Sequence, residues 1–278
     1  MHRTTRRLLA VLAALALLLA ACGSSDRDGA TTTTKAPAAD GSTTTAAPAD
    51  DLSGDITVAA AASLTETFTD LGTQFEADHP GTKVTFNFDS SGSLSDGILA
   101  GAPADVFASA DEKNMAKLTD AGLTDGDPVV FARNQLAIVT KPGNPKGIKT
   151  LADLADAGTI SLCGPDAPCG KFATQVLDQA GVKIPTSSVT LGQNVKATLT
   201  AVTEGDAVAG IVYLTDGLAA GDKVEVVDIP AADNAIAVYP VAALKASGHA
   251  AVAEAFAAFV ASDDGQKVLK EAGFLAPA

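Results

Sequence analysis

The chain has 278 residues and a formal net charge of −14, with 33 acidic residues against 19 lysines and arginines. This acidic surface makes nucleic acid and anionic lipid headgroups poor partners. Tryptophan is absent although hydrophobic residues make up 47% of the chain, so the core must be packed from many small aliphatic side chains.

The first residues have the pattern of an export signal. Several arginines precede an apolar run at residues 8–19, which is too short to cross a bilayer as a helix. The run ends in Leu-Ala-Ala-Cys22, which resembles the bacterial lipobox. Residues 1–21 are therefore predicted to be a cleaved signal peptide, and Cys22 to carry a lipid. The alternative is an ordinary signal peptide followed by an incidental cysteine.

Residues 22–53 are predicted to form a tether behind the lipidated Cys22. They consist almost entirely of Thr, Ala, Pro, Ser, Gly and Asp, and cannot bury enough surface to offset the entropy of the chain. Removal of the leader takes away three arginines and leaves 16 basic against 33 acidic residues, a net charge of −17.

The remaining residues alternate between strand-like and helix-like segments. In chain order we expect a strand at 56–61, a helix at 64–75, a strand at 84–88, a helix at 94–99, a strand at 105–109, a helix from 112, extended segments at 129–131 and 136–139, a helix at 151–157, a strand at 159–162, helices at 172–180 and 195–202, strands at 207–213, 224–227 and 236–239, and helices at 251–261 and 265–272. This alternation predicts a mostly parallel α/β architecture, in which ligands bind beyond the carboxyl ends of the strands.

Four predicted strand-to-helix turns are small, hydroxylated or glycine-rich and carry no charge at the helix start. They are residues 60–64, 88–94, 163–170 and 192–196. Hydroxyls and helix N-terminal amides supply donors without a countercharge, which suits a deprotonated oxyanion in a dry cleft. Each feature alone has a plainer interpretation. Ser63 with Glu66 fits a capping box, and a buried Tyr213 at a strand end needs only a local hydrogen bond.

The two cysteines of the main domain, Cys163 and Cys169, lie six residues apart. In an oxidising compartment this spacing favours a local disulfide. Metal binding is the alternative, but Cys-x5-Cys without a nearby histidine is poor spacing for zinc.

Enzyme motifs are missing from the sequence. His79 and His249 lie in polar stretches without a candidate nucleophile, and neither Ser-x-x-Lys nor Gly-x-Ser-x-Gly occurs. The loop at 164–171 is one residue too long for a P-loop, and Phe172 stands where a P-loop has Ser or Thr. Catalysis and a purely structural surface lipoprotein are therefore the weaker alternatives.

Four runs in this order resemble the periplasmic molybdate-binding protein family. They are Ile56–Thr65, Ser90–Leu94, Gly101–Phe107 and Gly210–Tyr213, and the similarity extends over residues 54–278. The resemblance implies a type II periplasmic-binding-protein fold, with two α/β lobes, a hinge of two crossover strands and a ligand cleft between the lobes. Residues 54–132 with 237–278 would form lobe 1, and residues 133–236 would form lobe 2.

The resemblance also implies a ligand set. The oxyanion would accept hydrogen bonds from the hydroxyls of Ser63, Ser91 and Tyr213 and from the backbone amides of Cys169 and Val195. Many relatives have alanine at the position of Cys169, a departure that a backbone contact tolerates. Molybdenum would be held only within its oxyanion, with no direct metal ligand and no cofactor. Asp89 and Asp166 flank these loops, and whether either supplies an acceptor is left open.

The function implied is that of an exported, monomeric solute-binding lipoprotein on the outer face of the membrane. It would pass molybdate to the permease of an ABC importer, with tungstate indistinguishable from molybdate by charge and size. The alternative ligand is another tetrahedral oxyanion such as sulfate, thiosulfate or phosphate. No enzymatic activity and no nucleic-acid partner are expected.

Overall fold

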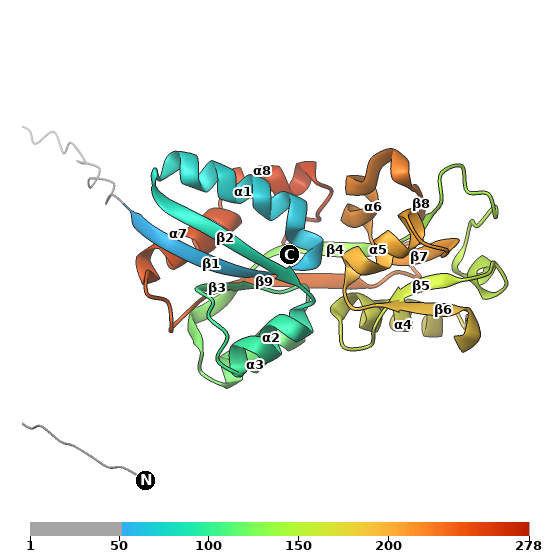
Figure 1. Ribbon diagram of the computed structural model, residues 1–278, viewed down its shortest axis with the longest axis horizontal. Helices are drawn as coiled ribbons and strands as arrows, with labels where there is room; N and C mark the ends of the chain where they lie inside the picture. The colour runs from blue at the N-terminus through green and yellow to red at the C-terminus, as the bar shows by residue number, and fades with distance from the viewer. Residues whose placement is uncertain (1–51, 278) are drawn as a thin grey trace, which may run out of the picture. The chain divides into compact units, whose positions relative to one another are not determined.

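The computed structural model in Figure 1 describes residues 52–277. The predicted signal peptide, the lipidated Cys22 and nearly all of the tether lie outside the described residues. Within residues 52–277, no helix combines the length and hydropathy that a membrane span requires.

The first sheet contains most of the N-terminal strands. β1 (Ser53–Ala61) lies between β2 (Gly81–Asp89) and β3 (Val106–Ala108) and is parallel to both. β9 (Ile236–Leu244) is antiparallel to β3, and the first part of β4 (Thr124–Thr140) is antiparallel to β9. The C-terminal strand therefore returns to the sheet in which the described chain began.

Five helices accompany this sheet, and apolar residues on their inner faces explain where each one packs. They are α1 (Thr65–Asp78), α2 (Ser91–Leu99), α3 (Glu112–Asp120), α7 (Ala250–Ala261) and α8 (Asp263–Glu271). In α1, for example, Phe68, Leu71 and Phe75 follow the helical spacing expected from the sequence, and all three are fully buried.

The second sheet forms around the end of β4. Residues 136–140 of β4 pair antiparallel with β7 (Ala209–Tyr213), and β8 (Glu225–Asp228) also joins β4. β5 (Ile160–Cys163) is parallel to β7 and to the edge strand β6 (Val189–Gly192).

Three α-helices accompany the second sheet. They are α4 (Pro168–Gln179), α5 (Val195–Thr203) and α6 (Leu214–Ala220). The chain thus forms two α/β lobes, and the long strands β4 and β9 lie side by side where the lobes join (Figure 1). The predicted lobe boundaries, at residues 132–133 and 236–237, fall inside β4 and at the start of β9. They remain a proposal.

Several sequence expectations need correction. Both sheets are mixed rather than mostly parallel, because β4 and β9 pair antiparallel with their neighbours. The two extended segments at 129–131 and 136–139 belong to the single strand β4. The helix expected at 151–157 is a short 3-10 turn, Leu151–Ala155, started by a capping box at Thr150.

One strand and one α-helix were not among the elements expected from the sequence, and both lack the usual signals. β6 is an edge strand of four residues whose Leu191 is 62% exposed, so no buried alternation marks it. α6 follows Tyr213 directly, has no side-chain cap and contains Gly217, a poor helix former.

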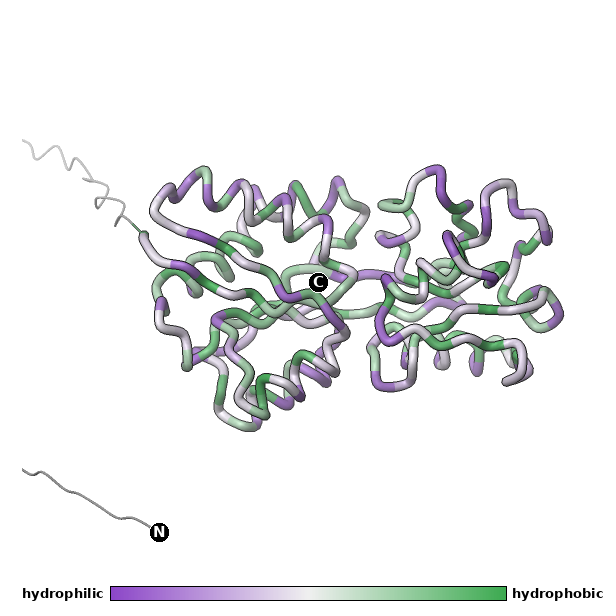
Figure 2. The backbone as a smooth tube through the Cα atoms, viewed as in Figure 1, coloured by the Kyte–Doolittle hydropathy of each residue, from purple (hydrophilic) through white to green (hydrophobic). Residues whose placement is uncertain are grey.

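The core of the first lobe is built around aromatic rings. Phe256 of α7 contacts Phe68, Phe75 and Phe86 at ring centroid distances of 6.1, 5.3 and 6.1 Å. The remaining volume is filled by Ala, Val, Leu and Ile side chains, as the composition predicted. In Figure 2 the central strands are mainly hydrophobic, and the hydrophilic segments lie mostly at turns and outer helix faces.

Phe256→Ala should lower the free energy of unfolding by about 3–5 kcal/mol, because it leaves a cavity among three aromatic rings. Urea unfolding measures the change. The exposed residue Leu191 provides the control, since Leu191→Ala should change the stability by less than about 0.5 kcal/mol. Equal effects of both substitutions would contradict this account of the core.

Candidate functional site

A small cavity lies between the two lobes, at the carboxyl ends of several strands. Its free volume is about 10 Å³, which favours a small ligand. The lining residues are Ala61, Ala62, Ser63, Asp89, Ser90, Ser91, Ala110, Ala167, Pro168, Cys169, Asn194, Val195 and Tyr213. All five ligand-contact residues predicted from the sequence are in this set. Of the two acidic residues in question, Asp89 lines the cavity and Asp166 does not.

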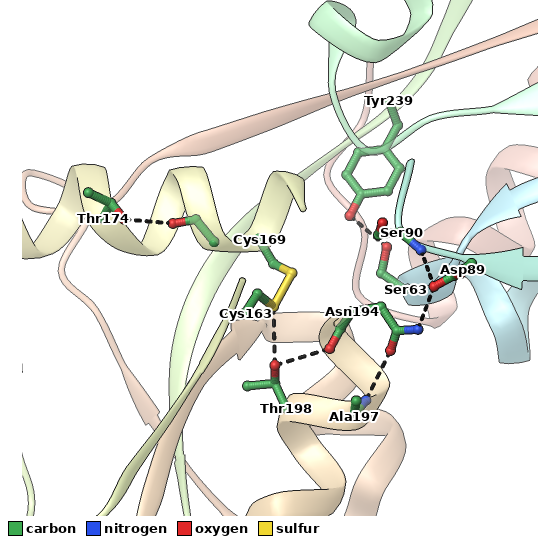
Figure 3. Close-up of a disulfide and its surroundings, with 11 residues drawn as sticks. Ser63, Asp89, Ser90, Cys163, Cys169, Thr174, Asn194, Ala197, Thr198 and Tyr239 are labelled. Carbon is green, nitrogen blue, oxygen red and sulfur yellow. Dashed lines mark hydrogen bonds between the residues drawn. A yellow bond between two sulfur atoms is a disulfide. The ribbon is translucent and has the colours of Figure 1, made fainter. Parts of the chain in front are cut away.

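Ser63 follows the end of β1 in a 3-10 turn, Ala62–Leu64. The capping-box interpretation is wrong, because α1 begins at Thr65 with Leu64 as its N-cap and no side chain caps it. The turn instead directs the Ser63 hydroxyl to within 2.9 Å of the Tyr239 hydroxyl (Figure 3). Ser63 is buried at the cavity wall and is not used to start the helix.

At the end of β2, two adjacent serines have different partners. The Ser90 hydroxyl accepts the Ser93 N–H at 3.1 Å and so caps α2. Ser91 is the first residue of α2 and is fully buried, and its oxygen accepts the Ala110 N–H at 2.9 Å. Because Ser90 caps the helix, the Ser91 O–H is left free to donate into the cavity.

The start of α4 is held by a disulfide between Cys163, the last residue of β5, and Cys169 (Figure 3). Pro168 occupies the first turn and has no N–H, so Cys169 provides the first amide donor of the helix. Gly170 is required by close packing, because a side chain there would collide with the carbonyl oxygens of Gly164 and Cys163. The predicted disulfide is thus present, and it ties the strand end to the helix start.

The start of α5 uses the same arrangement as α2. The Asn194 side chain accepts the Ala197 N–H at 3.0 Å and caps the helix, which leaves Val195 as the first helical residue at the cavity. The Asn194 amide group also donates to Asp89 Oδ1 at 2.8 Å, and the Ser90 N–H donates to the same oxygen at 2.7 Å. Asp89 therefore already has two donors on one of its carboxylate oxygens.

Tyr213 ends β7 and is only 2% exposed. Within residues 52–277 its hydroxyl has no hydrogen-bond partner, although it lies at the cavity. Burial raises the pKa of Tyr213 well above its ordinary value, and the neighbouring Tyr239, Asp111 and Asp216 raise it further. The hydroxyl is therefore protonated, and an unpaired buried donor is an unfavourable arrangement that a bound acceptor would relieve.

Polar contacts bridge the two lobes around the cavity. Lys171 Nζ of α4 lies 3.1 Å from Asp111 Oδ2, which directly precedes α3. Lys196 Nζ of α5 lies 2.6 Å from Glu66 Oε2 of α1. Gly92 lies against the carbonyl oxygen of Asp166, and a side chain at residue 92 would come within 2.6 Å of that oxygen. These contacts describe a closed arrangement of the lobes.

Lys196 also contacts a fully buried carboxylate, since its Nζ lies 2.8 Å from Asp216 Oδ1. Burial raises the pKa of Asp216 to about 6, and the nearby ammonium group of Lys196 limits that rise. For Lys196, burial lowers the pKa, but Asp216 and Glu66 outweigh it and the net shift is upward. No sequence pattern joined these three residues, because Glu66 lies 130 positions from Lys196.

The cavity therefore offers hydroxyls and helix-start amides, with Asp89 as its one carboxylate. Across the described part of the chain, no three His, Cys, Asp or Glu side chains come together as a metal site. Such a lining can bind a small anion through converging donors. It lacks a nucleophile paired with a base.

Comparisons with known proteins agree with this chemistry. Residues 56–275 match the family described as bacterial extracellular solute-binding protein. The chain is 40% identical over 223 residues to the molybdate-binding protein ModA of Mycobacterium tuberculosis, covering 80% of this chain and 85% of the relative. The Escherichia coli molybdate-binding protein ModA is 31% identical over 230 residues, covering 80% and 89%. The structure of the periplasmic molybdate-binding protein of Azotobacter vinelandii is similar at a TM-score of 0.74 and 27% identity, covering 80% and 100%.

Replacing both Cys163 and Cys169 with serine should lower the free energy of unfolding by about 2 kcal/mol, since the disulfide closes a short loop and restricts the unfolded chain. Urea unfolding with and without a reductant measures this. The reductant should destabilise the wild-type protein and leave the double variant unchanged. A wild-type curve that does not respond to reduction would contradict the prediction.

Asp216 should give stability a distinct pH dependence. The ordinary pKa of an aspartate is 3.8, and the pKa of Asp216 in the fold is about 6, so between these values the folded protein binds more protons than the unfolded chain. The contribution of Asp216 to the free energy of unfolding is therefore fully present below about pH 4 and is lost as the pH rises through about 6.

The measurement is urea unfolding at several pH values for the wild type and Asp216→Asn. The stability of the wild type relative to the variant should fall over this window and level off above it. Asp222→Asn removes an exposed carboxylate instead. In this variant the free energy of unfolding should depend on pH as it does in the wild type. If stability still falls with rising pH in Asp216→Asn, the pH dependence belongs to another group.

Proposed function

Because the chain belongs to the bacterial extracellular solute-binding protein family, we propose that it captures molybdate outside the cytoplasm and delivers it to an ABC importer. Support for this ligand comes from the donor-lined cavity, where the hydroxyls of Ser63, Ser91 and Tyr213 converge with two helix starts. Relatives that are 40% identical carry the name molybdate-binding protein.

The physics of the cavity favours a doubly charged, compact oxyanion. Converging dipoles stabilise such an ion more strongly in a dry cleft than in water. Helix N-termini add partial positive charge at Cys169 and Val195. The overall negative charge of the protein does not prevent binding, because distant charges are screened beyond about 10 Å at ordinary ionic strength.

The protein is a binding protein and not an enzyme, in keeping with its family. It needs no cofactor, since molybdate is the cargo. In the ligand set we propose, Ser63, Ser91 and Tyr213 donate through hydroxyl groups, and Cys169 and Val195 donate through backbone amides. Tungstate is an equivalent candidate ligand, and sulfate, thiosulfate and phosphate are the alternatives to be tested.

The remaining parts of the proposal concern how the domain is presented. A lipid on Cys22, with residues 22–53 as a tether, would hold a monomeric domain at the outer face of the membrane. Residues 54–132 and 237–278 would move as one lobe, and residues 133–236 as the other. Binding contacts from both lobes would favour the closed arrangement.

Ser63→Ala, Ser91→Ala and Tyr213→Phe should each weaken molybdate binding by about 1.5–3 kcal/mol, the scale of a hydrogen bond to a charged group. Titration calorimetry on the purified protein measures the affinities. Ser161→Ala is a matched control, because Ser161 is buried, has no hydrogen-bond partner among residues 52–277 and does not line the cavity.

Two outcomes would count against the proposal in different ways. Wild-type affinity in all three variants would remove these residues from the ligand set. A wild-type protein that binds sulfate or phosphate more tightly than molybdate and tungstate would replace the ligand itself.

A further inference from the structure

Tyr239 lies behind the cavity wall and is not part of its lining. Its side chain is fully buried, and its ring is enclosed by Phe131, Tyr213 and Phe274 at centroid distances of 6.2, 5.8 and 5.5 Å. The hydroxyl of this fixed ring reaches Ser63 Oγ at 2.9 Å (Figure 3). Tyr239 thus contacts a hydroxyl of the cavity lining without lining the cavity itself.

The direction of this hydrogen bond decides what Ser63 offers a ligand. If Tyr239 donates, the Ser63 proton is left over and faces the cavity, where an oxyanion can accept it. If Ser63 donates, the unused proton belongs to Tyr239, in a buried aromatic shell away from the cavity. An unpaired buried donor is unfavourable, so the first arrangement is preferred.

The groups around Tyr239 also favour Tyr239 as the donor to Ser63. Asn134 is fully buried, and its amide oxygen accepts the Gln135 N–H at 2.9 Å, while its NH₂ group donates to Thr215 Oγ1 at 2.9 Å. Burial raises the pKa of Tyr239, and the hydrogen bond with Ser63 only partly opposes the rise. The Tyr239 hydroxyl therefore keeps its proton and can donate it to Ser63 Oγ.

Two other hydroxyls of the cavity lining, those of Ser91 and Tyr213, also have a proton to donate to a ligand. Ser91 Oγ already accepts the Ala110 N–H, so its own proton is the group left for a ligand. The Tyr213 hydroxyl has no partner among the described residues and is a free donor. Ser63 would be the cavity hydroxyl most able to turn and accept a proton if Tyr239 did not hold it.

We propose that Tyr239 is a positioning residue that fixes Ser63 as a hydrogen-bond donor and so makes the site reject oxyanions that carry a proton. The inference rests on the proposed function and deepens it. Sulfate and hydrogen phosphate form a suitable probe pair, because above neutral pH they have the same charge and similar size but only phosphate carries a proton. A site that only donates leaves that proton without an acceptor.

Tyr239→Phe removes one hydroxyl and keeps the ring in its aromatic shell. Titration calorimetry with molybdate, sulfate and inorganic phosphate, above neutral pH on the purified full-length protein, measures three affinities for each variant. Molybdate binding should weaken about tenfold, since the Ser63 proton is no longer directed. The preference for sulfate over phosphate should shrink by about tenfold or more, because Ser63 can now accept the phosphate proton.

Ser63→Ala separates positioning from a general structural effect. It should weaken molybdate binding without relaxing the preference for sulfate, since alanine offers no acceptor. The double variant Ser63→Ala/Tyr239→Phe should bind molybdate no more weakly than Ser63→Ala, because Tyr239 acts through Ser63. Ser63→Ala also keeps the inference testable if Tyr239→Phe fails to fold. A gain of phosphate binding in Ser63→Ala would contradict the inference.

Asp89 is the carboxylate of the cavity lining, and its second carboxylate oxygen could also accept the proton of a ligand. In an Asp89→Asn background, the relaxed preference caused by Tyr239→Phe should persist. Its disappearance would assign the acceptor to Asp89 and overturn the role of Tyr239.

The remaining outcomes separate the inference from the proposed function. An unchanged sulfate preference in Tyr239→Phe, or losses that add in the double variant, would overturn the positioning role while molybdate binding by the wild type stands. A wild-type protein that does not bind molybdate would instead overturn the function from which the inference proceeds.

Discussion

The structure depends on the placement of hydrogen-bond donors around the cavity between the lobes, whose lining contains no positively charged side chain. A donor is useful there only if the fold has not already paired it, and helix starts normally have their donors paired by caps. The chain meets this demand with neighbouring residues that divide the work. Ser90 caps α2 and leaves the Ser91 O–H without that task, and Asn194 caps α5 and leaves Val195 as the first helical residue at the cavity. At α4 a proline without an N–H precedes Cys169, and a disulfide holds the turn.

The two lobes contribute to this arrangement in complementary ways. The first lobe provides Ser63 and Ser91 at the ends of β1 and β2, and the second provides the starts of α4 and α5 with Tyr213. The salt bridges of Lys171 and Lys196 across the lobes include partly exposed groups, and such pairs contribute about 0–1 kcal/mol each. They are too weak to lock the lobes together by themselves. A ligand that contacts both lobes would then have the larger effect on closure.

Much of the fold was predictable because its elements carry strong local patterns. The apolar stripe of α1 and the buried run of β7 follow from periodicity alone. The edge strand β6 and the helix α6 were missed, since one is exposed and the other has neither a cap nor a stripe. The resemblance to a family suggested five site residues that now line one cavity. The positions of Tyr239, Lys196 and Asp216 could not be found this way, because their roles depend on pairings between distant segments that no spacing records.

Gly92 and Asp166 show how little tolerance the closed arrangement has. Here the first turn of α2 meets a loop of the other lobe with only a hydrogen atom in between. The width of the gap between the lobes is thus set by main-chain atoms, which cannot change rotamer to make room. A single methyl group at residue 92 would act as a spacer between the lobes, and water would then reach donors that depend on a dry surrounding for their strength. The absence of a side chain at Gly92 therefore controls how completely a ligand between the lobes is sealed from solvent.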